Sequence, residues 1–281
     1  MTTWFITGAS SGLGAALANA VLDHGDNAVI TARNTDNLQA LVDAHPNTSL
    51  AVSLDVTDHD QVVAAIKAAV DRFGQIDVLV NNAGHGYRAA VEEAAPEEMQ
   101  ELFATNFFGP VDLIQQVLPQ MRERRSGTIV NVSSIGAPRS NPGSGFYTAT
   151  KTALEGMSDA LKREVGPLGI RVMVIEPGAF RTDFSGRSLT QSRRVIDAYA
   201  DTAGKRRKEN DRTHGTQQGD PDRAAQVILT TVNGEQAPFR LLLGTDAIKI
   251  VRDELQGRID EIDEWASISA TTDFAGEENG T

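Results

Sequence analysis

The chain has 281 residues, 40% of them hydrophobic, and 38 acidic side chains against 26 Lys and Arg give it a formal charge of −12. This charge argues against broad binding to nucleic acid or to an anionic membrane surface. The lack of cysteine excludes disulfides and thiol catalysis, and no His, Asp and Glu cluster has metal-ligand spacing, so we expect no metal. The first residues, "MTTWFITGASSG", lack a basic segment and a long apolar run, which favours a cytoplasmic protein without a signal peptide.

Seven short apolar runs alternate with segments whose apolar residues recur at helical spacing. Strands are expected at 3–6, 27–32, 49–54, 76–81, 127–134, 170–177 and 239–244. Alternating strands and helices predict βαβ units and a parallel sheet, and continuous Val, Ile and Leu suits strands covered on both faces. A final helix is expected over 245–265. We expect one domain over 1–265 and a flexible, acidic tail over 266–281.

The segment 185–220 departs from this regular pattern, because it is polar, charged and much longer than a normal connection. It lies between the sixth strand and a helix expected over 221–232. We interpret it as a lid over a functional site, with a disordered insertion as the alternative. Its basic run "KRRK" (205–208) would either meet an anionic substrate or cofactor phosphate, or form a solvated helix face.

A glycine-rich turn joins the first strand to the first helix. In "TGASSGLG" (7–14), Gly8, Gly12 and Gly14 lie where strand becomes helix. Glycine allows a tight turn and a close approach of the backbone to a pyrophosphate, and the helix N-terminus offers free N–H groups. Because the turn follows a strand and opens a helix, its context favours a nucleotide site over a purely structural turn.

Tyr147 and Lys151, in "SGFYTATKTAL", are about one helical turn apart and would share one face of a helix. A tyrosine with a pKa of roughly 10 is a poor proton carrier at neutral pH. A close ammonium group lowers that pKa in a partly desolvated site, so the pair suits a tuned acid/base in a cleft. By itself, however, the pair is more typical of an ordinary helix surface.

Five motifs in order supply the missing context: "TGASSGLG", "NNAG" (81–84), "NVSS" (131–134), "YTATK" (147–151) and "EPGAFRT" (176–182). Together they closely resemble the short-chain dehydrogenase/reductase family over residues 3–183, and more loosely to about 265. The resemblance implies a single α/β domain of Rossmann type, doubly wound around a seven-stranded parallel sheet. It also implies hydride transfer between NAD(P) and an alcohol or carbonyl, and a homodimer or homotetramer formed by the helices around 97–124 and 147–165.

The family's catalytic roles transfer to matching residues. Ser134, thirteen positions before the tyrosine, would hydrogen-bond the substrate oxygen, and Ser133 is the alternative that strand alternation would point the other way. Tyr147 would exchange a proton with that oxygen, while Lys151 would lower the tyrosine pKa and hold the nicotinamide ribose. Asn106, in "ATNFFG", would position a water in a relay towards the lysine, and its alternative role is bonding the backbone.

The resemblance also assigns the cofactor contacts. Asp55 and Val56 match residues that contact the adenine, although turn formation or helix capping is the alternative for Asp55. Phe180 would act through its backbone and Thr182 through its hydroxyl at the nicotinamide end. The full expected set is Gly8, Ser10, Ser11, Gly12, Leu13, Gly14, Arg33, Asp55, Val56, Asn81, Asn82, Ala83, Gly84, Tyr147, Lys151, Pro177, Gly178, Phe180 and Thr182.

The end of the second strand, "ITARN", bears on the choice of nicotinamide cofactor. An acidic residue there would bind the adenosine ribose of NAD, but this chain has Ala32 followed by Arg33, whose guanidinium suits a 2′-phosphate. NADP(H) is therefore favoured over NAD(H), although Ser10 and Ser11 stand where some NADP-preferring relatives carry a further basic residue.

We therefore predict an NADP-dependent oxidoreductase that acts on a small-molecule carbonyl or secondary alcohol. A non-catalytic NADP-binding or sensing protein on the same fold is the alternative. The substrate itself is not specified by these motifs, because pocket specificity in this family comes from variable loops. Side chains expected around the substrate are His85, Tyr87, Ile135, Asn141, Phe146 and Phe184.

Overall fold

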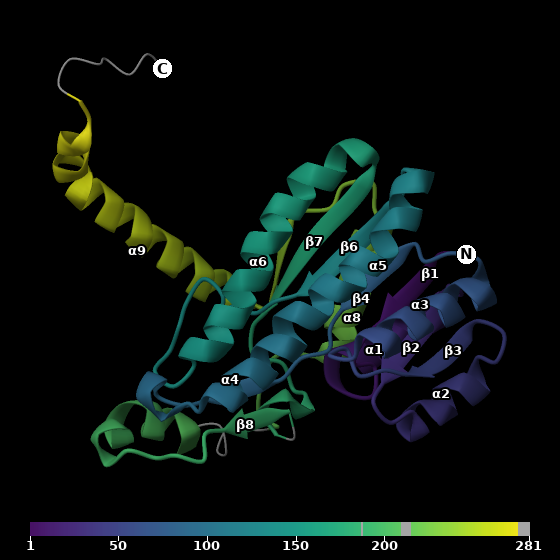
Figure 1. The fold of residues 1–281 in the computed structure, drawn as a ribbon, viewed down its shortest axis with the longest axis horizontal. Helices are drawn as coiled ribbons and strands as arrows, with labels where there is room; N and C mark the ends of the chain where they lie inside the picture. Colours follow the sequence, from purple (N-terminus) through teal and green to yellow (C-terminus); the bar gives the residue numbers. More distant parts are fainter. Residues whose placement is uncertain (187, 209–214, 275–281) are drawn as a thin grey trace.

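The computed structural model describes residues 1–186, 188–208 and 215–274. All seven predicted strands lie in one parallel sheet, in the order β3-β2-β1-β4-β6-β7-β9. This confirms the predicted doubly wound sheet of Rossmann type (Figure 1). The strands are β1 (Thr3–Ile6), β2 (Asn27–Ala32), β3 (Ser49–Ser53), β4 (Val78–Asn81), β6 (Gly127–Val132), β7 (Ile170–Pro177) and β9 (Arg240–Leu243).

Helices cover both faces of the sheet, and the side-chain alternation of β1 shows how. Trp4 and Ile6 pack in one hydrophobic cluster with α1 and α8, whereas Phe5, between them, packs in a second cluster with α3, α5 and α6. All three side chains are fully buried. The helices are α1 (Gly12–Asp23), α2 (Gln39–Ala44), α3 (His59–Phe73), α4 (Pro96–Phe103), α5 (Gly109–Arg124), α6 (Gly145–Val165), α8 (Pro221–Asn233) and α9 (Thr245–Ser269).

The strand order reverses direction between β1 and β4, and this determines where a ligand can bind. The chain proceeds outward from β1 to β2 and β3 on one side, and from β4 to β6, β7 and β9 on the other. In open α/β sheets, ligands bind beyond the carboxyl ends of the strands at such a switch point. The glycine-rich turn follows β1, "NNAG" begins at the last residue of β4, and "NVSS" extends from β6.

A small second sheet, which the sequence did not predict, lies beside this edge. β5 (Gly86–Arg88) pairs in parallel with β8 (Leu189–Gln191), over a separation of about a hundred residues. The pairing is extended by hydrogen bonds from the Gly86 amide to the Ser188 carbonyl and from the Ser192 amide to the Arg88 carbonyl. The segment after β7 therefore returns to the loop that follows β4.

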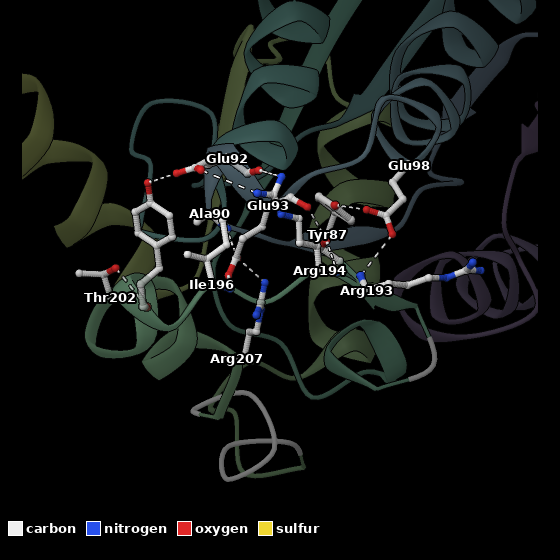
Figure 2. A network of polar contacts seen from close by, with 12 residues as sticks. Tyr87, Ala90, Glu92, Glu93, Glu98, Arg193, Arg194, Ile196, Thr202 and Arg207 are labelled. Atoms are coloured by element: carbon white, nitrogen blue, oxygen red, sulfur yellow. Dashed lines mark hydrogen bonds and ion pairs between the residues drawn. The ribbon is translucent and has the colours of Figure 1, made fainter.

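Glu93 anchors this returning segment. Figure 2 shows its carboxylate accepting hydrogen bonds from the Ala90 and Ile196 amides and from the Arg207 guanidinium. Burial raises the pKa of Glu93, but those three hydrogen bonds outweigh it and the net direction is downward. Arg207 itself is nine-tenths buried, so the "KRRK" run is not simply a solvated helix face. The described part of the expected lid is thus attached through a buried ion pair.

We predict that the lid gains order when NADP(H) or substrate binds, because Ser188, Thr190 and Arg206 border the cavity described below. Hydrogen exchange over residues 188–208 should slow on ligand addition. Glu93→Gln should speed exchange there without ligand, since it weakens the charged anchor. Equal protection in every state would contradict a moving lid. Residues 187 and 209–214 of the expected lid lie outside the described residues.

The final helix is longer than predicted. α9 continues to Ser269 instead of ending near 265, and a short 3-10 turn over Ala270–Thr272 follows it, so the first residues of the expected tail are helical. Figure 1 shows α9 extending away from the body of the domain. Residues 275–281 of the expected tail lie outside the described part. Among the described helices, none is long and apolar enough to cross a membrane.

Candidate active site

A cavity of about 1210 Å³ lies along the carboxyl edge of the sheet. It brings together most of the residues expected to bind the cofactor or substrate. Gly14, Asn81 and Asn106 do not border it. The expected residues that do border it are Gly8, Ser10, Ser11, Gly12, Leu13, Arg33, Asp55, Val56, Asn82, Ala83, Gly84, Ser134, Tyr147, Lys151, Pro177, Gly178, Phe180 and Thr182.

The glycine-rich turn forms one wall of the cavity, and its geometry requires glycine. Gly8 has a φ of +66°, and a Cβ there would lie 2.9 Å from the Ala83 Cα. A Cβ on Gly14 would lie 2.4 Å from the Gly8 carbonyl oxygen, so Gly14 serves close packing behind the turn. The Asn82 side chain donates to the carbonyls of Thr7 and Gly8 at 2.9 and 3.0 Å. The turn and the "NNAG" loop are therefore one rigid cradle that fits a dinucleotide.

Asn81 supports the sheet rather than the cavity. It is buried, and its Nδ2 donates to the Asn131 Oδ1 on the neighbouring strand at 2.8 Å. Asn131 in turn donates to the Ser158 hydroxyl on α6 at 2.8 Å. This chain of contacts fixes β4, β6 and α6 relative to one another.

The two serines after β6 have different hydrogen-bond partners. Ser133 borders the cavity as well, but its hydroxyl is buried and donates to the Glu155 carboxylate at 2.6 Å. Ser134 faces the cavity, where its Oγ accepts from the Gly136 amide at 3.0 Å. A Cβ on Gly136 would be 3.3 Å from both the Ser134 Oγ and the Tyr147 ring, so the two side chains share one small space. Ser134 is therefore the serine available to a ligand.

Tyr147 and Lys151 lie one turn apart near the start of α6, and both are buried at the cavity wall. Burial raises the pKa of Tyr147, while the Ser134 hydroxyl and the charge of Arg88 lower it. The charge of Arg88 therefore acts on Tyr147, which the sequence pattern did not indicate. The Lys151 ammonium donates to the Val132 carbonyl at 2.8 Å, and burial lowers its pKa to about 8.

Asn106 lies in a π-helical turn (Ala104–Phe108) between α4 and α5, and it is fully buried. Its side chain accepts from the His85 amide at 3.0 Å and donates to the His85 carbonyl at 2.9 Å and to the Thr150 hydroxyl at 3.2 Å. These contacts hold the loop before β5 against α6. Such interruptions of an α-helix are frequent at functional sites, and this one positions the wall beside Lys151.

The part of the cavity expected to hold the adenosine is bordered by a basic, an acidic and an apolar residue: Arg33, Asp55 and Val56. Arg33 is exposed at the cavity margin, directly after Ala32, which is buried. The Asp55 carboxylate accepts from the Thr57 amide and hydroxyl at 3.0 and 2.8 Å, so it forms the turn that was its alternative role. Its main-chain position still borders the cavity beside Val56.

The loop expected at the nicotinamide end, residues 177–182, is held by the first turn of α9. The Asp246 carboxylate accepts from the Ala179 amide at 2.8 Å, and a Cβ on Gly178 would lie within 2.5 Å of that carboxylate. Thr182 reaches back towards the glycine-rich turn, since its Cβ is 3.2 Å from the place of a Gly12 Cβ. The loop therefore borders the cavity beside the glycine-rich turn.

The substrate side differs from expectation in three residues. His85, Ile135, Asn141 and Phe184 border the cavity as predicted, but Tyr87 and Phe146 pack away from it with Leu102. Arg88, which the sequence reasoning did not single out, borders the cavity and is 8% exposed. An arginine at the end of a three-residue strand carries no pattern that distinguishes it from a surface residue. It lies in β5, which pairs with β8 across about a hundred residues.

The family model for short chain dehydrogenases matches residues 2–193. An oxidoreductase of Botryotinia fuckeliana is 38% identical over 247 residues, covering 88% of this chain and 90% of that protein. A short-chain dehydrogenase structure from Streptomyces avermitilis has a TM-score of 0.91 and 42% identity, and the match covers 97% of this chain and 98% of that one.

Other solved structures carry nicotinamide cofactors. An archaeal alcohol dehydrogenase from Thermococcus sibiricus, complexed with 5-hydroxy-NADP, has a TM-score of 0.71 and 26% identity over 86% of this chain and 96% of its own. A 3-ketoacyl-(acyl-carrier-protein) reductase from Brucella melitensis, complexed with NADH, gives a TM-score of 0.70 at the same identity and coverage. The match of family, fold and cradle means that this chain belongs to the short-chain dehydrogenase family and is an oxidoreductase of that family.

Proposed function

We propose that this protein is an NADP-dependent carbonyl reductase or alcohol dehydrogenase that uses Ser134, Tyr147 and Lys151. The observation that carries the proposal is that these three side chains border the same cavity as the glycine-rich cradle. A bound nicotinamide cofactor would supply or accept the hydride. The protein would then have to hold the substrate oxygen and move one proton, and these are the tasks that its own side chains fit.

The raised pKa of Tyr147 suits the reduction direction. At neutral pH the buried phenol keeps its proton, which it would donate to the carbonyl oxygen as the carbon gains a hydride. Ser134 would hold the same oxygen through its hydroxyl. Lys151 would hold the cofactor ribose and help to stabilise the phenolate, and Asn106 would position a water in the relay towards Lys151. Alcohol oxidation needs the phenolate, so it should speed up as pH rises.

The proposal includes a preference for NADPH, supported by Arg33 at the cavity margin and by Ala32 where an acid would bind a free ribose. We expect Arg33→Ala to weaken NADPH binding by about ten- to a hundredfold, the effect of one charge-assisted contact of roughly 1.5–3 kcal/mol. NADH affinity should change little. Adding Ala32→Asp should lower the NADPH preference further, because its carboxylate would repel the phosphate.

Dissociation constants for both cofactors at one salt concentration measure this preference. Arg163→Ala is the matched control, because Arg163 is an exposed arginine on α6 that does not border the cavity. If Arg33→Ala weakened NADH as much as NADPH, Arg33 would serve packing alone and the NADP assignment would lose its main support.

The alternative is a protein of the same fold that binds or senses NADP without catalysis. A panel of aldehydes and ketones, with NADPH consumption followed by absorbance, separates the two. Turnover of any panel member that disappears in Tyr147→Phe supports an oxidoreductase. Tight NADPH binding without turnover across the panel would favour the sensor.

A further inference from the structure

Arg88 is placed by β5 so that its side chain turns towards the catalytic centre. Successive residues in a strand point to opposite faces. Tyr87 points one way, where its hydroxyl donates to the Glu98 carboxylate at 2.6 Å. Gly86 shares the other face with Arg88, and a Cβ on Gly86 would lie 3.4 Å from the Phe184 ring. That ring is 5.8 Å, centroid to centroid, from the ring of Tyr147.

The guanidinium of Arg88 is buried without a counterion. It is 8% exposed, its Nη1 donates to the Tyr87 carbonyl at 3.1 Å, and its Nε has no hydrogen-bond partner. Within the described residues no carboxylate forms an ion pair with it. Burial lowers its pKa to about 10, with a further lowering by the charge of Arg206, so it remains charged at neutral pH. A buried, unpaired charge of this kind is costly unless an anion completes it.

The lining of the cavity has more basic than acidic side chains, although the protein as a whole has a negative net charge. The chain has a formal charge of −12, yet cationic side chains outnumber acidic ones around the cavity. Two of the three acids already accept backbone hydrogen bonds: Asp55 from Thr57 in its own turn, and Asp246 from the Ala179 amide of a neighbouring loop. The cations are Arg33, Arg88, Arg139, Lys151 and Arg206, and the acids are Asp55, Glu101 and Asp246.

We propose that Arg88 binds a carboxylate on the substrate, so that the enzyme acts on keto acids or hydroxy acids in preference to neutral ketones and alcohols. The planar guanidinium fork matches a carboxylate, and its place beside Tyr147 would fix the carbonyl against the proton donor. Arg33 stands at the adenosine end, whereas Arg88 acts on the Tyr147 side of the cavity. This assignment rests on the proposed oxidoreductase function and adds a substrate class to it.

The test compares unbranched keto acids, with the ketone two to five carbons from the carboxylate, against their methyl esters. With NADPH, the wild type should show a kcat/KM for at least one acid about ten- to a hundredfold above that for its ester. Arg88→Met should remove most of that preference by lowering turnover of the acid much more than turnover of the ester. Arg88→Lys, which keeps the charge but loses the fork, should retain part of it.

Arg163→Met is the matched control, because Arg163 is an exposed arginine on α6 outside the cavity and its loss should preserve the preference. A second readout avoids dependence on a good substrate: saturated carboxylates of matched length should inhibit ester reduction competitively, and Arg88→Met should abolish the inhibition. Ester and acid reduced equally well, with or without Arg88, would overturn the carboxylate site while leaving the oxidoreductase function intact. NADPH binding without reduction of any ketone would overturn the function itself.

Discussion

Replacing Tyr147 by phenylalanine should lower kcat by a factor of about 10² to 10⁴, the usual contribution of a positioned general acid. The change removes only the phenol oxygen, and the ring keeps its packing against Phe184. NADPH affinity should remain within a few-fold of the wild type, because the cradle around Gly8 and Asn82 is untouched. Steady-state turnover and cofactor titration together measure the two effects.

Tyr199→Phe is the matched control for this substitution. It removes the same oxygen from a tyrosine whose hydroxyl donates to Glu92 at 2.8 Å, outside the cavity. Its turnover should stay close to that of the wild type. Turnover of Tyr147→Phe within a few-fold of the wild type would remove the proton-donor role from Tyr147.

Replacing Glu176 by glutamine should stabilise the protein at pH 8 but not near pH 4.5. Glu176 lies in β7 and is 1% exposed, with its Oε1 3.5 Å from the Arg240 Nε. Burial raises its pKa to about 7, with a further increase from Glu155 and an opposing effect of Arg240. Between pH 4.5 and 7 the folded state therefore holds a proton that the unfolded chain has lost. Its contribution to stability falls as pH rises through this window.

Above pH 7 the cost of the buried charge reaches about 3 kcal/mol, at roughly 1.4 kcal/mol for each unit of pKa shift. Glutamine keeps the shape without the charge, and Arg240 keeps its contact with Glu155 at 3.1 Å. Denaturant unfolding at pH 5 and pH 8 measures the difference. Glu123→Gln, an exposed change on α5, is the control. A stability gap between Glu176→Gln and the wild type that did not widen with pH would contradict this account.

The large sheet could be predicted because each of its strands carries a continuous apolar run between turns. β5 and β8 could not, because three residues give no readable period and their pairing joins Gly86 to Leu189 across the whole catalytic region. A similarly long separation in sequence, 114 residues, kept the contact between Glu93 and Arg207 from being predicted. Local patterns predict elements, whereas these contacts depend on where the elements are brought together in space.

The positions of site residues could be predicted where a motif fixes the backbone geometry. They could not be predicted where burial of the side chain determines its contacts. Gly8 and Ser134 lie at the cavity as their motifs implied. The Asn106 side chain instead forms hydrogen bonds with His85 and Thr150, so its proposed role in a water relay stays a prediction. Arg88 is a charged residue inside the fold, and nothing in its sequence neighbourhood distinguishes it from a surface charge.

The loop over residues 177–182 is bonded to α9, the helix that extends away from the body of the domain. Asp246 holds the Ala179 amide from the first turn of a helix of 25 residues, most of whose length makes no buried contact. At about 1.5 Å per residue the helix is roughly 37 Å long, so a tilt of about 10° at its base would move its far end by about 6 Å. A small displacement of this loop that tilted α9 would thus move the C-terminal end of the helix by a larger distance.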